Sequence, residues 1–342
     1  MTSIRHSSPE TGGTAAPEGT MRAIVQDEYG EADVLRLARV PRPQIGDAEV
    51  LVQVHAAGVD RGVWHVMTGL PYLGRLAFGL RRPKNPVLGG DVAGTVVAVG
   101  SAVTGFAAGD EVYGWGKGTF AEYAVVPAAR LARKPANLSF EQAAVVPVSA
   151  STAWQGLHDA GRIQAGQHVL VVGASGGVGS YAVQLAKVAG AEVTGVASTE
   201  KLDLVRALGA DHVIDYRTQD WADGARRYDL ILDIAGNPPL GKLRRALTPT
   251  GTAVITGGED GGSFSGGMNR QLRALALSPF VKQRLTFFLG VVRRRDLERL
   301  TELIEAGEVT PSVGASYPLD RAPDAVRDLA SGKIRGKASI VV

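Results

Sequence analysis

The sequence contains no cysteine among its 342 residues. This absence excludes disulfide bonds, thiolate nucleophiles and cysteine-bound zinc, so a metal site would have to use histidine and carboxylate ligands alone. The chain also lacks the run of about 18 apolar residues that a membrane-spanning helix needs. We therefore expect a soluble protein that functions without a membrane.

Net charge is small as well, because 37 Lys and Arg residues against 34 Asp and Glu residues leave only +3. The basic residues are scattered apart from short runs such as residues 293–295, which predicts a solvated helix face and no nucleic-acid partner. An apolar share of 45% is sufficient for the cores of two domains. Residues 1–20 are rich in Ser, Thr, Gly, Pro and Ala, which predicts a disordered tail, no secretion signal and a cytoplasmic protein.

Glycine, in contrast, is abundant, with 44 residues, and its most informative cluster follows an apolar stretch. Residues 169–172 have strand character, residues 173–179 contain four glycines, and a helical pattern comes next. This order is typical of a dinucleotide-binding fold, in which free N–H groups of the first helical turn bind a pyrophosphate. Since Ala174 replaces the first glycine of the G-x-G-x-x-G pattern, the match consists of Ala174, Gly176 and Gly179.

A second strand is predicted at residues 192–197, about 20 residues after the glycines, where NAD-binding proteins place an acid that binds the ribose 2′-hydroxyl. Residues 198–201, Ser-Thr-Glu-Lys, provide hydroxyls followed by a cation there instead. These groups suit a 2′-phosphate, which favours NADP(H). The alternative is that Ser198 or Thr199 caps a helix and Lys201 is solvated, and both interpretations can hold together.

The remaining sequence predicts two kinds of domain. From residue 21 to about 126, short β-rich runs alternate with Gly and Pro turns, as in a twisted, barrel-like β domain. Ser139 and Gln142 have capping-box spacing at a helix start. Strands then alternate with helices, and one of these helices is predicted at residues 201–209. The alternation predicts an α/β fold with a doubly wound parallel sheet. The closing strand, residues 338–342, is expected to rejoin the first domain.

In this order the pieces resemble the medium-chain dehydrogenase/reductase superfamily, specifically its zinc-independent, NADPH-dependent quinone oxidoreductase-like branch. The motifs that carry the resemblance are residues 86–94 (PVLGGDVAG), 109–112 (GDEV), 173–179 (GASGGVG), 209–216 (GADHVIDY) and 335–337 (RGK). The resemblance implies a Rossmann-type nucleotide-binding domain at residues 144–285. It also implies a GroES-like, mostly β catalytic domain at residues 21–143 and 286–342, an active site in the cleft between the domains, and a homodimer.

Zinc-dependent members of the superfamily hold their catalytic metal with an early Cys, a His-Glu pair and a second Cys. Here the matching positions hold Asp60, Gly90-Asp91 and about Val148. Glycine and valine offer no ligand atom, and the structural zinc loop with its cysteines is also missing, so we predict no metal site. Asp60, His65 and Asp91 could still supply two carboxylates and a histidine, although such groups more often serve as hydrogen-bonding partners.

Three residues are candidates for chemistry in the cleft. The resemblance places Asp60 in a segment that lines the nicotinamide, where an acid could hydrogen-bond the carboxamide or the substrate, or relay a proton. His65 matches a proton-relay position of zinc alcohol dehydrogenases, although Gly62 replaces the hydroxyl that would complete the relay. Tyr72 could donate a proton or stabilise an enolate by hydrogen bonding. The alternatives are a structural role for His65 and a cleft-lining role for Tyr72.

For the cofactor, the resemblance places the glycine turn at the pyrophosphate, with Ala174, Ser175, Gly176, Gly177 and Val178. Around the 2′-phosphate it places Ser198, Lys201 and Tyr216. Towards the nicotinamide it places Ala235, Gly257, Phe287, Phe288 and Leu289. The two phenylalanines could equally be core residues, and Lys337 reaches either the cofactor or solvent. Residues 270–280 show a helical apolar stripe that could cap the cleft, form a dimer interface or pack in the core.

The missing Lewis acid bears on the reaction, because an unactivated alcohol or ketone would lose its main source of oxyanion stabilisation during hydride transfer. Quinones and α,β-unsaturated carbonyls need less help, since conjugation spreads the incoming negative charge. The sequence therefore predicts a zinc-independent oxidoreductase that transfers hydride from NADPH to a quinone or conjugated carbonyl. The alternatives are an NADP-dependent alcohol dehydrogenase or carbonyl reductase, and a catalytically silent NADPH-binding sensor or interaction protein.

Overall fold

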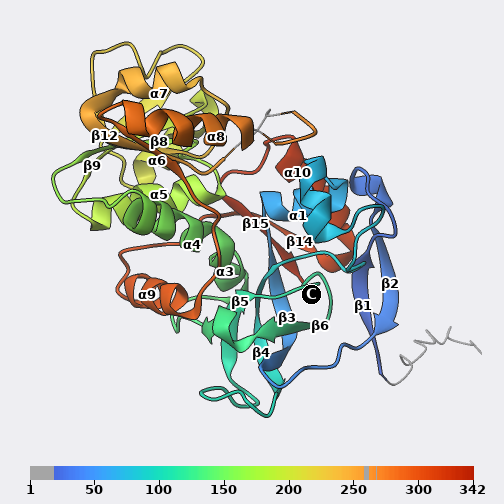
Figure 1. Ribbon diagram of the computed structural model, residues 1–342. Helices are drawn as coiled ribbons and strands as arrows, with labels where there is room; N and C mark the ends of the chain where they lie inside the picture. The colour runs from blue at the N-terminus through green and yellow to red at the C-terminus, as the bar shows by residue number, and fades with distance from the viewer. Residues whose placement is uncertain (1–18, 258–261, 267) are drawn as a thin grey trace, which may run out of the picture.

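The computed structural model of the protein describes residues 19–257, 262–266 and 268–342. Two domains, each built on a β-sheet, lie side by side (Figure 1). The expected tail falls on residues outside the described ranges, except for its last two positions. There the expectation is wrong, because Gly19 accepts a hydrogen bond from the Arg42 N–H at 2.8 Å and Thr20 pairs with Pro41. Residues 19 and 20 therefore belong to the folded chain.

The nucleotide-binding domain contains the doubly wound parallel sheet that the sequence predicts. Its strand order is β10-β9-β8-β11-β12-β13, with every neighbouring pair parallel. The order reverses between β8 and β11, and in such sheets ligands bind beyond the carboxyl ends of the strands at that point. The strands are β8 (His168–Val172), β9 (Glu192–Ala197), β10 (His212–Asp215), β11 (Tyr228–Asp233), β12 (Leu247–Ile255) and β13 (Arg284–Phe287). Strand β13 crosses residue 286, the expected start of the second catalytic-domain segment.

Helices follow these strands as the alternation predicts. They are α5 (Gly177–Val188), α6 (Leu202–Ala207), α7 (Leu240–Ala246) and α8 (Met268–Leu277). The helix predicted at residues 201–209 is shorter than expected at both ends, because Lys201 lies in a 3-10 turn (Thr199–Lys201) and Gly209 has a φ of +98° that a helix does not allow. Helix α5 buries its face around Ala182, Leu185 and Ala186 against the sheet.

The catalytic domain contains a seven-stranded, mainly antiparallel sheet in the order β14-β15-β3-β4-β5-β7, in which β6 also pairs with β3. The closing strand β15 pairs with β3 through Ala338 and Val59, so the expected return to the first domain is confirmed. The strands are β3 (Glu49–Val59), β4 (Asp91–Val99), β5 (Glu111–Trp115), β6 (Tyr123–Pro127), β7 (Leu131–Arg133), β14 (Val313–Pro318) and β15 (Lys337–Val341), beside a separate antiparallel pair, β1 (Thr20–Val25) and β2 (Arg36–Pro41).

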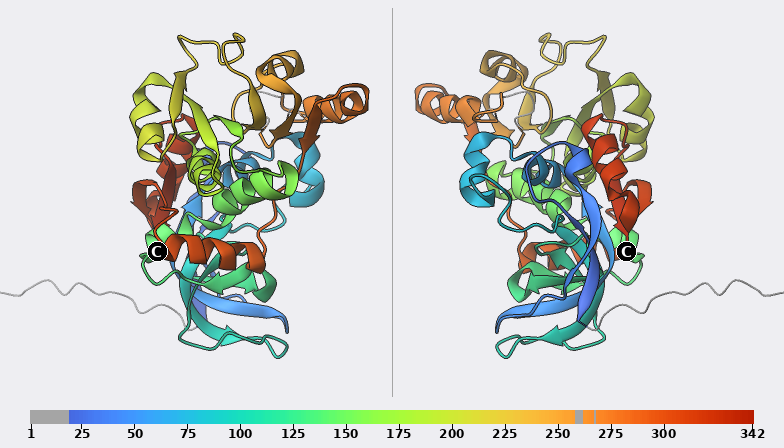
Figure 2. Two further views of the ribbon diagram at one scale, coloured as in Figure 1. Left: turned by 90° about the vertical axis from the view of Figure 1, so that its left-hand side faces the viewer. Right: turned by 90° about the vertical axis from the view of Figure 1, so that its right-hand side faces the viewer.

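Helices α4 (Pro147–Gln155) and α9 (Arg294–Glu305) connect the two domains, since α4 contacts α5 on one side and β4 and β5 on the other (Figure 2). The phenol of Tyr113 donates to the Leu297 carbonyl at 2.7 Å and so joins β5 to α9. The other helices are α1 (Arg61–Thr68), α2 (Arg75–Phe78), α3 (Phe140–Ala144) and α10 (Ala322–Ala330). The capping box predicted at Ser139 and Gln142 starts α3 and is confirmed. Within the described ranges, no helix has the length and apolar character to cross a membrane.

Candidate functional site

The glycine turn lies at the carboxyl end of β8, where close backbone approaches require its glycines. Gly173 has a φ of +87°, which residues with side chains rarely adopt. A Cβ atom on Gly179 would lie 2.1 Å from the Gly173 carbonyl oxygen. Ser175 and Val178 complete the turn, and α5 begins directly after Gly176. The first N–H groups of a helix have no partner within it, so this turn can receive an anion.

Lys337 approaches the same turn from β15, and its burial excludes the solvated alternative. Only 3% of the residue is exposed. A Cβ on Gly177 would lie 2.7 Å from the Lys337 Cδ, so a glycine is needed for the lysine stem to pass. Within the described ranges the Lys337 Nζ has no hydrogen-bond partner, and it forms an ion pair with the Asp91 Oδ2 at 3.7 Å. Burying an ammonium group without hydrogen bonds is costly, so this position suits an oxygen-rich ligand.

Asp91, at the start of β4, is itself fully buried. Its Oδ1 accepts a hydrogen bond from the Val148 N–H at 3.0 Å, while its Oδ2 has no such partner among the described residues. Burial, opposed by the Lys337 ammonium and reinforced by the Asp60 carboxylate, raises the pKa of Asp91 to about 8. A glycine cradle and an unsatisfied buried cation together fit the pyrophosphate and ribose of a dinucleotide.

The expected 2′-phosphate residues gather beyond the ends of β9 and β10. Ser198 is buried and Tyr216 is 56% exposed. Lys201 is not solvated, because its Nζ donates to the carbonyl oxygens of Gly332 at 2.8 Å and Ile334 at 2.9 Å. An ammonium group has three N–H donors, so one remains for a ligand.

A further cation, Arg335, lies near Lys201 and was missed by the sequence reasoning. Burial and the Arg335 charge lower the pKa of Lys201. Arg335 donates to both carboxylate oxygens of Asp203 at 2.7 Å. The Arg-Gly-Lys motif at residues 335–337 was a signal that could have indicated it.

On the nicotinamide side, Ala235 and Gly257 lie at the carboxyl ends of β11 and β12. Ala235 packs against Gly173, and a Cβ on Gly257 would lie 1.7 Å from the Ile234 carbonyl oxygen. Phe287 and Phe288 are half-buried against the domain cores, as their alternative interpretation expects, and Leu289 is 77% exposed. Cofactor contacts of these last three residues stay predictions.

The three catalytic candidates occupy one stretch of the catalytic domain. Asp60 caps α1, with its Oδ1 accepting from the Val63 N–H at 3.1 Å. The Nδ1 of His65 contacts the Leu70 carbonyl oxygen at 2.7 Å, a bond that supports the structural alternative. Tyr72 is 47% exposed, and its N–H donates to the Ser263 carbonyl oxygen at 2.8 Å, which joins this stretch to the nucleotide-binding domain.

Within residues 19–257, 262–266 and 268–342, no three His, Asp or Glu side chains are grouped so that they could hold a metal ion. Asp60, His65 and Asp91 are therefore not brought together as a ligand set. At Gly90, which the resemblance matches to a zinc-binding histidine of zinc-dependent members, a Cβ would lie 2.6 Å from the Trp115 Nε1.

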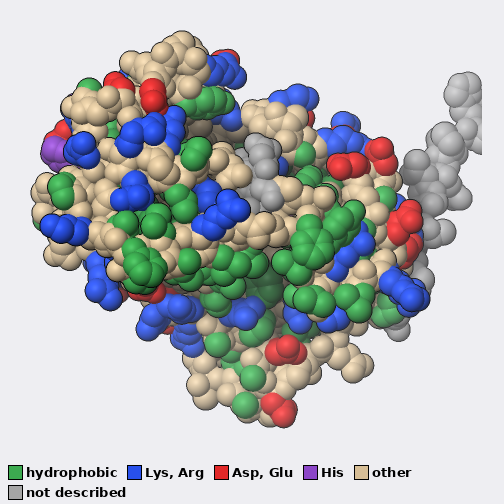
Figure 3. All heavy atoms as spheres, turned by 45° about the horizontal axis from the view of Figure 1, so that its top comes forward, with side chains coloured by type: hydrophobic (Ala, Val, Ile, Leu, Met, Phe, Trp, Pro, Cys, Tyr) green, Lys and Arg blue, Asp and Glu red, His purple; other side chains and the backbone are tan. Residues whose placement is uncertain are grey.

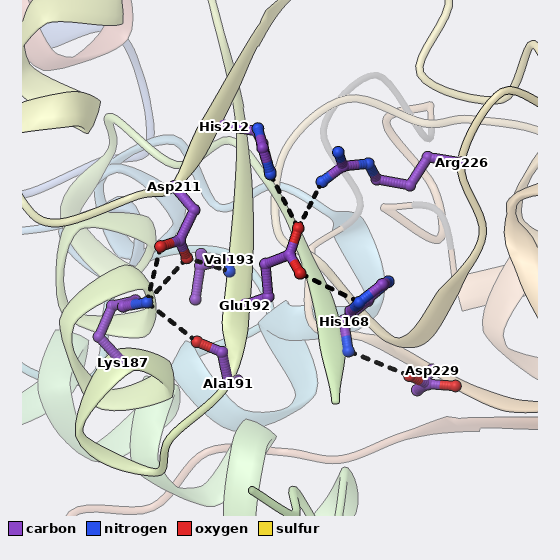
Figure 4. Close-up of polar contacts among 9 residues, drawn as sticks. All are labelled: His168, Lys187, Ala191, Glu192, Val193, Asp211, His212, Arg226 and Asp229. Carbon is purple, nitrogen blue, oxygen red and sulfur yellow. Dashed lines mark hydrogen bonds and ion pairs between the residues drawn. The ribbon is translucent and has the colours of Figure 1, made fainter. Parts of the chain in front are cut away.

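A separate polar cluster lies at the amino ends of β8, β9 and β10, opposite the cofactor site (Figure 4). Glu192 accepts hydrogen bonds from His212 and Arg226 at 2.8 Å, and its Oε2 lies 3.1 Å from the His168 Nε2 in an ion-pair contact. The hydrogen bond from His212 is the main cause that lowers the pKa of Glu192. All four side chains are partly exposed. Because the cluster lies at the amino ends of the strands, it joins strand ends and is not part of the candidate site.

The site can now be compared with known proteins. Residues 46–136 match the alcohol dehydrogenase GroES-like domain family, and residues 208–341 match the zinc-binding dehydrogenase family. The human NAD(P)H oxidoreductase RTN4IP1, mitochondrial, is 33% identical over 96% of this chain and 91% of its own length. The chain belongs to the medium-chain dehydrogenase/reductase superfamily. More specifically, it is a quinone oxidoreductase-like member, and the predicted family and fold are confirmed.

Two other superfamily members are similar along most of their length. The NADPH-dependent alkenal/one oxidoreductase, chloroplastic, of Arabidopsis thaliana is 34% identical over 94% of this chain and 79% of its own. The structure of the quinone oxidoreductase from Coxiella burnetii superposes with a TM-score of 0.84 at 27% identity, covering 94% of this chain and 99% of that chain. This likeness identifies the chain as an oxidoreductase of the superfamily and supports a nicotinamide cofactor.

Proposed function

We propose that this protein reduces a quinone or an α,β-unsaturated carbonyl compound with NADPH, without a catalytic metal ion. The observation that carries the cofactor assignment is the buried ammonium group of Lys337, which has no hydrogen-bond partner among the described residues and whose stem passes Gly177 in the glycine turn. Ser198, the remaining N–H of Lys201 and Arg335 favour the 2′-phosphate of NADPH over the bare ribose of NADH. The reduced nicotinamide ring of NADPH would supply the hydride and leave as NADP+.

The proposed substrate class follows from the donor set of the cleft. Gly90 and Val148 supply no ligand atoms at positions that the resemblance matches to zinc ligands of zinc-dependent members, so stabilisation of an oxyanion would depend on hydrogen bonds. Conjugated acceptors need the least stabilisation, because their negative charge is delocalised. The relatives named for quinones and alkenals or alkenones support the same class.

In this proposal the residues of the Asp60–Tyr72 stretch orient the substrate and supply a proton. One oxygen of Asp60 caps α1, and the other would accept a hydrogen bond from the cofactor carboxamide or the substrate. Tyr72 would donate a proton to the reduced acceptor from its phenol. His65 is the second candidate donor, although its Nδ1 is engaged by Leu70.

The test follows NADPH oxidation at 340 nm after exhaustive chelation, with quinones, an enone, aldehydes and a ketone as acceptors and NADH in parallel. Rapid consumption with a quinone or enone, unaffected by the chelator and faster with NADPH, is the expected result. Turnover confined to aldehydes or ketones would favour the carbonyl reductase alternative. Tight NADPH binding with no turnover of any acceptor would favour the sensor.

We also propose a homodimer and a cytoplasmic location for the protein. Strand β13 forms one edge of the parallel sheet, and an unpaired sheet edge can be continued by a second copy. Sedimentation velocity would test the dimer. The location needs a direct test by fluorescence microscopy of the tagged protein, because the human and Arabidopsis relatives are named as mitochondrial and chloroplastic.

A further inference from the structure

Helix α8 buries one of its two arginines and exposes two of its three leucines. Arg270 and Ala274 are buried on one face, whereas Leu272 and Leu275 are exposed. Amphipathic surface helices normally have the opposite arrangement. The buried arginine therefore needs an explanation in terms of what it contacts.

Arg270 forms a buried ion pair with Asp233, the last residue of β11. The Arg270 Nη1 lies 2.6 Å from the Asp233 Oδ2, and the pair is 9% and 1% exposed. Two polar atoms of the pair, Asp233 Oδ1 and Arg270 Nε, have no hydrogen-bond partner among the described residues. Buried pairs with incomplete hydrogen bonding contribute little to stability, so stability alone does not account for the pair.

The guanidinium group also joins the two loops that follow β11 and β12. Its Nη1 donates to the Pro238 carbonyl oxygen at 3.1 Å, and its Nη2 donates to the Gly257 carbonyl oxygen at 2.9 Å. The planar fork of an arginine can hold several acceptors in fixed positions, whereas a lysine cannot. These loops contain Ala235 and Gly257, the residues expected beside the nicotinamide.

The segment just before α8 contacts the catalytic domain. Besides the bond from Tyr72 to Ser263, the Leu73 N–H donates to the Phe264 carbonyl oxygen at 3.2 Å. A Cβ on Gly266 would lie 2.8 Å from the Pro71 ring. Figure 3 shows one face of the molecule, on which hydrophobic side chains are gathered near its middle. Helix α8 is therefore linked to the nicotinamide loops through Arg270 and to the Tyr72 stretch through residues 263–266.

We propose that Arg270 is a positioning residue that holds the nicotinamide loops in place relative to the stretch carrying the candidate proton donor. Asp233 holds the guanidinium group in this orientation through its Oδ2. The catalytic part of this inference rests on the proposed function. The positioning itself can be tested in the complex with NADPH whether or not an acceptor is known.

Substitution of Arg270 by lysine keeps the charge but removes the fork, and Asp233→Asn removes the charge while keeping a similar shape. Arg273→Lys on the same helix is the matched control, because Arg273 is exposed. With a working acceptor, we expect R270K to lower kcat roughly 10- to 100-fold, since misplacement by about 1 Å costs that much in rate. The KM for NADPH should change less than about threefold, because the glycine turn and Lys337 are intact.

Two further readouts separate positioning from general destabilisation. The deuterium isotope effect with NADPH labelled at the transferred position should rise in R270K, and added guanidinium ion should restore part of the activity of R270A. In the NADPH complex, hydrogen exchange at residues 234–238 and 256–257 should accelerate in R270K and D233N but not in R273K. Exchange unchanged in R270K and D233N would overturn the inference. A loss of activity with unchanged isotope effect and no guanidinium rescue would also overturn it. Failure of every acceptor with the wild-type protein would overturn only the proposed function, since the exchange measurement still decides the positioning.

Discussion

Replacement of Lys337 by methionine provides the sharpest test of the cofactor site. Methionine is unbranched and similar in length, so it can occupy the path of the lysine stem beside Gly177. The substitution removes the buried ammonium group and leaves Asp91 without its counter-ion. Burial already raises the pKa of Asp91 to about 8, and loss of the Lys337 charge removes a cause that lowers it. The carboxyl therefore stays protonated at neutral pH, and we expect the fold to survive.

The expected magnitude follows from the bond that the ammonium group would make to the cofactor. A hydrogen bond to a charged group contributes about 1.5–3 kcal/mol, and each 1.4 kcal/mol changes an equilibrium constant about tenfold. The Kd for NADPH should therefore rise about 10- to 100-fold in K337M. The Kd for NADH should rise by a similar factor, because Lys337 lies at the glycine turn, where the expected ligand is the pyrophosphate that both cofactors share.

The assay is isothermal titration calorimetry of NADPH and NADH at one fixed ionic strength, with thermal unfolding of each variant as the control for folding. Lys333→Met is the matched variant, because Lys333 is an exposed lysine of the same C-terminal region, paired with Asp328. An unchanged Kd in a folded K337M protein would refute the assignment. Equal weakening in K333M and K337M would show that only the general positive charge matters, and would refute it as well.

Two further predictions concern the carboxylates beside this site. Asp60→Asn keeps the cap of α1, because Asn caps as well as Asp, whereas Asp60→Ala loses it at a cost of about 1 kcal/mol. We expect both variants to lower kcat, while urea denaturation should show a lower unfolding free energy in D60A alone. A fully active D60N would contradict the proposed role of Asp60. For Asp91, a native pKa of about 8 against a reference value of 3.8 means that the native state binds more protons between these values. The unfolding free energy should therefore decrease as pH rises through this window, and Asp91→Asn should flatten that dependence in urea denaturation at a series of pH values; an equally steep dependence in D91N would show that another group causes it.

The backbone of the site was largely predictable from local patterns. Strand β9 has the predicted bounds, and the capping box at Ser139 forms as its spacing indicates. The glycine turn could be recognised because close backbone approaches within the turn require glycine at fixed positions. Such local requirements leave a pattern in the sequence itself. The return of the closing strand to the first domain was also predicted from the order of elements, and the pairing of β15 with β3 confirms it.

The side-chain environment of the site was less predictable, because it depends on contacts between distant segments. The partners of Lys201 are carbonyl groups at residues 332–334, and nothing near Lys201 in sequence indicates them. Likewise, the apolar stripe in residues 270–280 was recognised, but periodicity could not show that Arg270 is buried against Asp233. Such pairings follow from tertiary packing, which local propensity does not contain.

The position of β15 has a consequence for how the chain is made. The nucleotide-binding sheet uses consecutive segments, β8 to β13, so it can fold once those residues have left the ribosome. The catalytic sheet contains β15 between β14 and β3, so it cannot be completed until residues 337–341 have been synthesised. Most of its other strands are synthesised earlier. Until then residues 56–59 of β3 lack the partner that β15 provides, and this stretch is open to aggregation. The same late strand delivers Lys337, so a nascent chain acquires the cation of its cofactor site only when the catalytic sheet is complete.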